Sequence, residues 1–340
     1  MTGLKFNSLQ AGRALAALVV VLHHGVGASR DFVALVPEPL NTIGAFGYLG
    51  VDFFFILSGF IIYYTNIRKI GTPGWPARYL QGRFFRVYLP YWAVTGVLVT
   101  AYLLVPSLSA GARETELVSS FLLVPSRVKP ILSVGWTLQH EVMFYALFLL
   151  GALSGRLLTV IAVWAVAILG YAALSDGWHD LLKFALHPIN LEFIAGMGIA
   201  WCFIAGQAAR PLGAALGLAA GVALFAVAGF DRDWSVFIGL GLASVVSMMV
   251  ALEAAGKLRV AALWVLLGDA SYAIYLIHLP LMSLTARLCA KVPVLDNWPA
   301  ALATGLGASI AAGLVFHLAF ERPLLAALHA MPIFARKAAH

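Results

Sequence analysis

The sequence predicts an all-α, polytopic integral membrane protein with about ten transmembrane helices and both termini in the cytoplasm. Of the 340 residues, 62% are hydrophobic and only 11% are charged. A water-soluble chain of this length needs more charged residues to cover its surface. The charges that are present gather in short segments between long apolar runs, which is typical of a protein whose solvent is lipid.

The apolar runs are long enough to cross a membrane. A helix rises about 1.5 Å per residue, so a run of about 20 residues crosses a hydrocarbon core of about 30 Å. The ten expected spans lie near residues 9–28, 44–66, 85–106, 135–153, 157–174, 187–205, 212–230, 234–252, 265–290 and 300–321. We expect them to form one transmembrane domain over residues 1–340, because no segment between them suits a separate soluble domain.

The distribution of charge predicts the orientation of the helices. With the N-terminus inside, most lysines and arginines between the spans fall on the cytoplasmic side, and the acidic residues lie mainly outside. The net charge of +7 is therefore explained by the orientation of the helices in the membrane. The sequence has no basic tract with interleaved aromatic residues that would indicate binding of nucleic acid. We expect a multi-pass protein of the cytoplasmic (inner) membrane, in contact with membrane lipid.

Cysteine and metal chemistry are not expected. The two cysteines, Cys202 and Cys289, each lie inside an apolar run, so neither a disulfide framework nor a paired-cysteine metal site is available. No group of His, Cys, Asp and Glu has convincing ligand spacing, and we predict no metal.

The first span contains ionisable residues, which cost about 2.5 to 3.5 kcal/mol each at the centre of a membrane helix and so indicate function. Arg13 and His24 are about three helical turns apart, so they share a face and lie about 16 Å apart along the axis. A neutral His24 imidazole can take a proton from a sugar hydroxyl. His23 points about 100° away, and a role as an interfacial polar residue explains it; the same role stays open for His24.

Two carboxylates enter later spans from the outer side. Asp52 is a candidate partner for an imidazole on the first span, and a local capping role is the alternative. Glu141 is a candidate acid, base or acceptor for substrate hydroxyls. Trp136, which offers a flat face to a sugar ring, and Tyr145 are the candidate substrate-binding residues. An interfacial aromatic belt with a carboxylate at the helix start is the alternative for this segment.

A basic patch precedes the third span. Arg83 and Arg86 lie three residues apart and share one helix face. Two guanidinium groups placed in this way can bind the phosphates of a nucleotide-bearing acyl donor. Anchoring of a helix end at the cytoplasmic surface explains the same pattern.

Five motifs, taken in order, resemble those of the membrane-bound acyltransferase 3 family. They are Arg13 with His24, Gly50-Val-Asp-Phe-Phe-Phe-Ile-Leu-Ser-Gly-Phe60, Arg83-Phe-Phe-Arg86, Trp136-Thr-Leu-Gln-His-Glu-Val-Met-Phe-Tyr145 and Ser271-Tyr-Ala-Ile-Tyr-Leu-Ile-His278. The resemblance covers almost the whole chain, and the opening Asn7-Ser-Leu-Gln-Ala-Gly-Arg13 is most similar to the exopolysaccharide O-acetyltransferases of that family.

The resemblance implies transfer of an acetyl or similar acyl group from cytoplasmic acyl-coenzyme A, most simply acetyl-CoA, to a hydroxyl of an extracytoplasmic glycan or polysaccharide precursor. It implies that His24 acts as a general base or transient acyl carrier, assisted by Asp52 and Glu141. It also implies that Arg83 and Arg86, together with Arg13, contact the donor. The esterase domain and the eleventh span of some relatives are not expected here.

Two readings from other classes compete with the enzyme. A transporter or flippase for a polysaccharide precursor also has many spans with buried charges, although no internal symmetry of broken helices is evident in this sequence. A sensor or scaffold protein would use the basic patch to bind anionic lipid.

Overall fold

The computed structural model of the chain describes residues 6–33, 36–108, 116–174, 180–207, 209–230 and 234–330. Within these residues the secondary structure is helical, without a β-strand. The α-helices are α1 (Asn7–Phe32), α2 (Glu38–Ala45), α3 (Leu49–Asn66), α4 (Trp75–Leu104), α5 (Leu117–Leu122), α6 (Gly135–Leu153), α7 (Leu157–Leu174), α8 (Asp180–Ala185), α9 (Leu191–Ile204), α10 (Pro211–Val227), α11 (Val236–Ala254), α12 (Ala262–Asp269), α13 (Ser271–Cys289), α14 (Trp298–Phe316) and α15 (Arg322–Ala330). A π-helix, His317–Glu321, joins α14 to α15.

The all-helical, polytopic membrane fold that composition predicts is confirmed. Seven helical stretches are long and apolar enough to cross a membrane, by length and composition: Asn7–Phe32, Glu38–Asn66, Trp75–Leu104, Leu182–Ile204, Val236–Ala254, Ser271–Cys289 and Trp298–Leu328. The remaining three expected spans coincide with α6 and with two shorter apolar helices, Leu157–Ala173 and Pro211–Val227. Residues 1–5 and 331–340, for which a cytoplasmic position is predicted, lie outside the described residues.

Differences from the expected boundaries at two spans affect residues of the motifs. The helix expected from residue 85 begins at Trp75, because Gly74 adopts a positive φ of 70° and Pro76 stands in the first turn, where its missing N–H costs nothing. The basic patch is therefore helical. The run expected from residue 265 is divided at Ala270 into α12 and α13.

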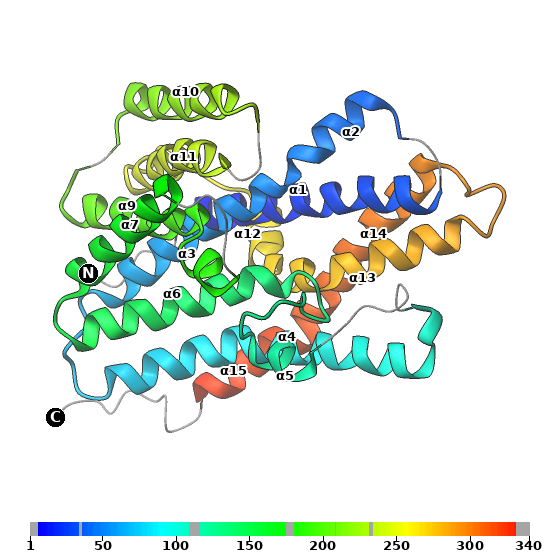
Figure 1. Ribbon diagram of the computed structural model, residues 1–340, viewed down its shortest axis with the longest axis horizontal. Coiled ribbons are helices and arrows are strands. Elements are labelled where there is room, and N and C mark those ends of the chain that lie inside the picture. Colours follow the sequence, from blue (N-terminus) through cyan, green and yellow to red (C-terminus); the bar gives the residue numbers. More distant parts are fainter. Residues whose placement is uncertain are drawn as a thin grey trace.

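The helices form a bundle in which α1 packs against α3, α12, α13 and α14. Further close pairs are α3 with α9, α10 with α11, and α13 with α14. In Figure 1 the long helices run side by side, and α1 begins and α15 ends at the same end of the bundle, on the left. Residues from distant parts of the sequence thus meet around α1.

The contact between α3 and α9 is close because two glycines lie in it. A Cβ atom on Gly59 would collide with the carbonyl oxygen of Phe193, and one on Gly196 would collide with that of Ile56. Small residues let membrane helices approach in this way. The contact holds α3, which carries two of the motifs' polar residues, firmly in the bundle.

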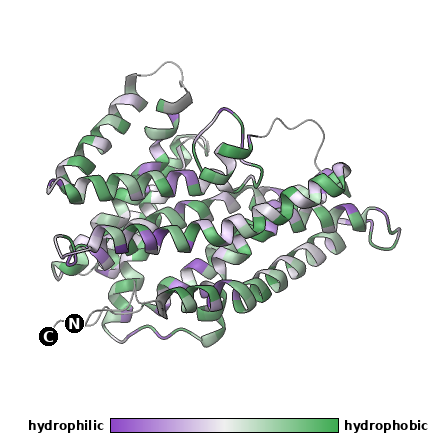
Figure 2. Ribbon diagram, turned by 90° about the horizontal axis from the view of Figure 1, so that it is seen from below, coloured by the Kyte–Doolittle hydropathy of each residue, from purple (hydrophilic) through white to green (hydrophobic). Residues whose placement is uncertain are grey.

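The outer surface is apolar. Large aliphatic side chains are highly exposed along several helices, among them Val97 (72%), Val166 (69%) and Val227 (86%). Figure 2 shows hydrophobic residues along most helices and hydrophilic ones grouped inside the bundle and at its ends. Such a surface fits contact with lipid, where backbone groups are satisfied inside the helices.

Candidate active site

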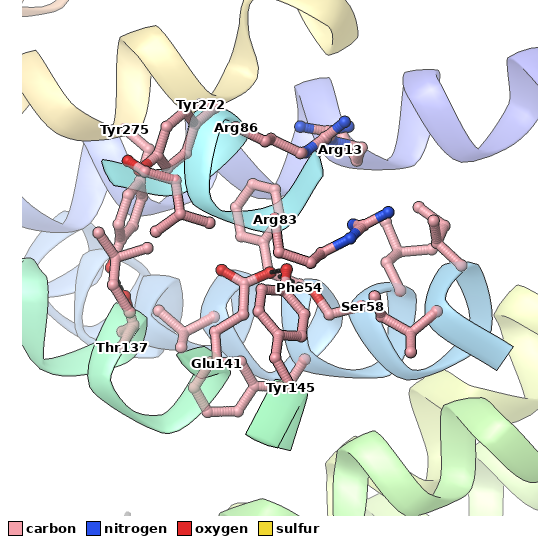
Figure 3. Close-up of a pocket in the computed structure, with 17 residues that line it drawn as sticks. Arg13, Phe54, Ser58, Arg83, Arg86, Thr137, Glu141, Tyr145, Tyr272 and Tyr275 are labelled. Atoms are coloured by element: carbon pink, nitrogen blue, oxygen red, sulfur yellow. Dashed lines mark hydrogen bonds between the residues drawn. The ribbon is translucent and has the colours of Figure 1, made fainter. Parts of the chain in front are cut away.

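A small cavity of about 80 Å³ lies among α1, α3, α4, α6 and α13 (Figure 3). Its polar lining consists of Arg13, Ser58, Arg83, Arg86, Thr137, Glu141, Tyr145, Tyr272 and Tyr275. The structure therefore brings together all three arginines that the sequence predicts to bind a donor, with one predicted catalytic carboxylate and one predicted substrate-binding tyrosine. The cavity has room for a few water molecules or for one small chemical group.

The three arginines differ in burial. Arg13 is only 9% exposed, and its Nε donates a hydrogen bond of 3.1 Å to Oγ of Ser271. Arg83 is partly buried, with its guanidinium carbon 5.6 Å from the ring centre of Tyr145. Arg86 is exposed at the protein surface. The lining thus leads from an exposed guanidinium to a buried one.

Arg13 and Arg86 lie near one another, and the charge of Arg86 acts on the Arg13 guanidinium group (Figure 3). Arg13 forms no ion pair within the described part of the chain. Glu141, Glu321 and Asp269 offset part of the repulsion between the two guanidinium groups, and an anion bound beside them would offset more of it. The arrangement is chemically suited to a negatively charged ligand.

Glu141 is held by hydroxyl groups from two helices. Ser58 Oγ on α3 donates a hydrogen bond of 2.8 Å to Glu141 Oε1. The hydroxyl of Tyr145, one turn later on α6, donates to the same oxygen. In Figure 3 the Glu141 side chain points into the cavity. Its orientation is fixed by these bonds, as a group that handles a proton or a substrate hydroxyl requires.

His24 lines a second and larger cavity of about 1380 Å³. Its Nδ1 lies 3.0 Å from the carbonyl oxygen of Val20 and 3.1 Å from Nε2 of His278 on α13. His23 also lines this cavity, but its Nδ1 donates a hydrogen bond of 2.7 Å to the carbonyl oxygen of Gly44 and so ties α1 to the end of α2. The two adjacent histidines therefore have different surroundings.

The linings of the two cavities include residues that are close in sequence, at the start of α6 and in α13. Thr137 and Tyr275 line the small cavity, and their hydroxyls lie 2.9 Å apart in a hydrogen bond. Ser133 and Ile277, one turn or less away on the same chain segments, line the large cavity. The Thr137–Tyr275 bond thus joins α6 to α13 beside residues that line the large cavity.

Asp52 and Trp136, the other two predicted site residues, are in neither lining set. Asp52 is 1% exposed and lies beside the fully buried Glu192 on α9, with which it interacts electrostatically. Trp136 is partly buried, and its ring packs edge to face on His140 at 5.8 Å. Both residues are close to the site in sequence but are held by other neighbours.

Several polar residues of the site are not among the predicted site residues. They are Ser58, Thr137, Tyr272, Tyr275 and His278. All of them stand inside apolar runs and inside the quoted motifs, which is the signal that could have selected them. Among the described residues, no group of three or more His, Cys, Asp or Glu side chains could hold a metal ion.

Comparison with known proteins identifies the family. Residues 6–318 match the model of the acyltransferase domain that defines the acyltransferase 3 group. Over 300 residues the chain is 33% identical to the exopolysaccharide production protein ExoZ of Rhizobium meliloti (strain 1021), a match that covers 84% of this chain and 90% of that protein. No solved structure matches the chain significantly. The chain is thus a membrane acyltransferase and belongs to the acyltransferase 3 family.

Proposed function

We propose that the protein transfers an acetyl group from acetyl-coenzyme A, bound from the cytoplasmic side of the inner membrane, to a hydroxyl of an extracytoplasmic exopolysaccharide or its precursor. The observation that carries this proposal is the convergence of Arg13, Arg83 and Arg86 with Glu141 on one cavity. His24, in the larger cavity, serves as general base or as a transient acyl carrier.

The donor site follows from the arginines. Arg86 and Arg83 at the open side suit the phosphates of the coenzyme, since guanidinium groups bind phosphate oxygens in pairs. The cavity of about 80 Å³ is far smaller than the coenzyme, so only the thioester end enters it and the nucleotide stays outside. Buried Arg13 then faces the reacting end of the donor.

The polarity of the site agrees with transfer across the membrane. Arg13 and His24 occupy different cavities, and they lie on one helix about 16 Å apart along its axis. The arginine-rich end corresponds to the cytoplasmic end by the distribution of positive charge. The large cavity at His24 therefore receives the acceptor from the opposite side, and the thioester end of the donor extends toward it past Thr137 and Tyr275.

The proposal that the acceptor is an exopolysaccharide is based on the similarity to ExoZ. ExoZ is named for exopolysaccharide production, and the match to it extends over most of both chains. The sugar hydroxyl supplies the oxygen that attacks the thioester carbonyl; the C–S bond breaks, and the hydroxyl proton goes to the base.

Calorimetric titration of acetyl-coenzyme A into the purified protein tests the proposal. The wild type is expected to bind saturably, and Arg83→Ala/Arg86→Ala to lose the binding heat. Arg78→Ala is the matched control, because Arg78 lies on the same helix, outside the cavity lining, and donates to the carbonyl oxygen of Pro73 at 2.9 Å. Absence of binding to folded wild-type protein would contradict the donor assignment and favour a transporter of polysaccharide precursors.

A further inference from the structure

We propose that His278 is a positioning residue for His24: it accepts a hydrogen bond from the Nδ1–H of His24 and so keeps the lone pair of that ring on Nε2. The inference rests on the proposed function, in which His24 is the base. The two residues are 254 positions apart in the sequence and meet because α13 packs against α1.

The tautomer of His278 follows from its backbone contact. Its Nδ1 lies 2.7 Å from the carbonyl oxygen of Tyr275, and the side chain is fully buried. A carbonyl oxygen only accepts hydrogen bonds, so Nδ1 of His278 carries the proton. In the neutral ring, Nε2 is then the acceptor, and it lies 3.1 Å from Nδ1 of His24.

The tautomer of His24 follows in turn. Its Nδ1 lies between two acceptors, Nε2 of His278 at 3.1 Å and the carbonyl oxygen of Val20 at 3.0 Å. Both require a proton on this nitrogen. The neutral His24 ring therefore has its lone pair on Nε2, the nitrogen that a general base uses when a carbonyl or an acceptor ring holds the other one.

The contact also orients the ring. The two imidazole rings lie 4.9 Å apart between centres and are tilted by 54°. His278 is itself fixed, because Tyr275, one turn earlier on α13, is hydrogen-bonded to Thr137 on α6. Beside His24, Gly25 leaves the space into which Met282 of α13 and Leu302 of α14 pack. The orientation of His24 is thus set by three other helices.

In the reaction, His278 acts through its hydrogen bond to His24. As the acceptor oxygen bonds to the thioester carbonyl carbon and the C–S bond breaks, His24 Nε2 takes the hydroxyl proton and later gives it to the departing thiolate. During this interval His24 is an imidazolium whose Nδ1–H remains bonded to His278 Nε2. His278 contacts no reacting atom, but it stabilises this cation and holds the ring in place.

Two substitutions separate the functions of the two His278 nitrogens. The amide of Gln reaches the position of Nε2 and can accept from His24, whereas the amide of Asn reaches only the position of Nδ1. We expect His278→Asn to lower kcat by about 10- to 100-fold with an unchanged KM for acetyl-coenzyme A. His278→Gln is expected to recover most of that loss.

The assay follows radiolabelled acetate from acetyl-coenzyme A into the glycan fraction of membrane vesicles from the source strain, deleted for its own copy of the gene. Equal kcat for His278→Asn and wild type would overturn the inference, as would equal losses in the Asn and Gln variants. His24→Ala separates the two levels: full activity in that variant contradicts the proposed function itself, whereas its loss beside normal His278→Asn activity contradicts only the positioning role.

A spectroscopic measurement tests the tautomer without turnover. In protein labelled with ¹⁵N-histidine, solid-state NMR is expected to report a protonated Nδ1 and an unprotonated Nε2 for His24, with the signal assigned by its loss in His24→Ala. A neutral His24 with its proton on Nε2 would overturn the inference.

Discussion

Ser58 on α3 and Glu141 on α6 are joined by a hydrogen bond of 2.8 Å, although 83 residues separate them in the sequence. Both residues line the small cavity, and the Glu141 carboxyl group faces the arginines of the same lining. Tyr145 donates to the same carboxyl oxygen from within α6. One acceptor therefore serves two hydroxyl donors.

The two donors to Glu141 are expected to be coupled. Ser58→Ala and Tyr145→Phe should each lower the acetyl-transfer rate about 5-fold, corresponding to about 1 kcal/mol for one lost hydrogen bond. The double variant should lose more than the product of the two effects, because the remaining donor compensates in each single variant. Rates in a double-mutant cycle provide the check. Thr65→Ala, which removes a hydroxyl bonded only within α3, should leave the rate unchanged.

The arginines at the donor site are not interchangeable with lysine. Arg83→Lys and Arg86→Lys keep the charge but lose paired contacts to phosphate, so acetyl-coenzyme A should bind about 10-fold more weakly to each. Arg83→Lys also loses the planar group over Tyr145. Calorimetry measures the affinity, with Arg78→Lys as control. Affinities equal to that of the wild type would leave the two arginines only a topological role.

Substitutions of the adjacent residues His24 and His23 are expected to affect different properties, acetyl transfer in the first case and stability in the second. His24→Ala should abolish acetyl transfer and leave acetyl-coenzyme A binding intact, because His24 lies outside the lining of the donor cavity. His23→Ala should retain transfer but lower stability by about 1 kcal/mol, since it loses the bond to Gly44. Transfer assays and thermal unfolding in detergent give the two readouts. Undiminished transfer in His24→Ala would exclude His24 as the base.

The glycine contact between α3 and α9 is expected to be intolerant of one methyl group. Gly196→Ala places a Cβ against the carbonyl oxygen of Ile56 and should reduce the yield of folded protein in the membrane. Gly198, two residues later on the same helix, has open space around its Cβ position, so Gly198→Ala should fold normally. Fluorescence-detected size-exclusion chromatography compares the two. Equal yields would mean that α3 and α9 can move apart at little cost.

The arrangement of the site depends on contacts that sequence patterns do not encode. The separation of Arg13 and His24 along one helix is predictable, because helical periodicity is a local property of the chain. The meeting of Ser58 with Glu141 and of His24 with His278 is not, because each pair comes from helices whose register depends on how side chains interlock. The proximity of Asp52 on α3 to Glu192 on α9 is a further example, because the packing of those two helices brings the residues together.

Three features can be predicted from the sequence: the α-helical membrane fold, the positions of the apolar runs, and the polar residues inside those runs. They can be predicted because hydrophobicity and helical periodicity are local properties of the chain. Only the folded arrangement of the helices shows that the arginines and Glu141 share one cavity, that His24 lines another, and that His278 contacts His24. Lipid stabilises any apolar helix that is long enough to cross the membrane, but it does not determine which other helix packs against that helix. Close contacts such as Gly59 against Phe193 select those partners.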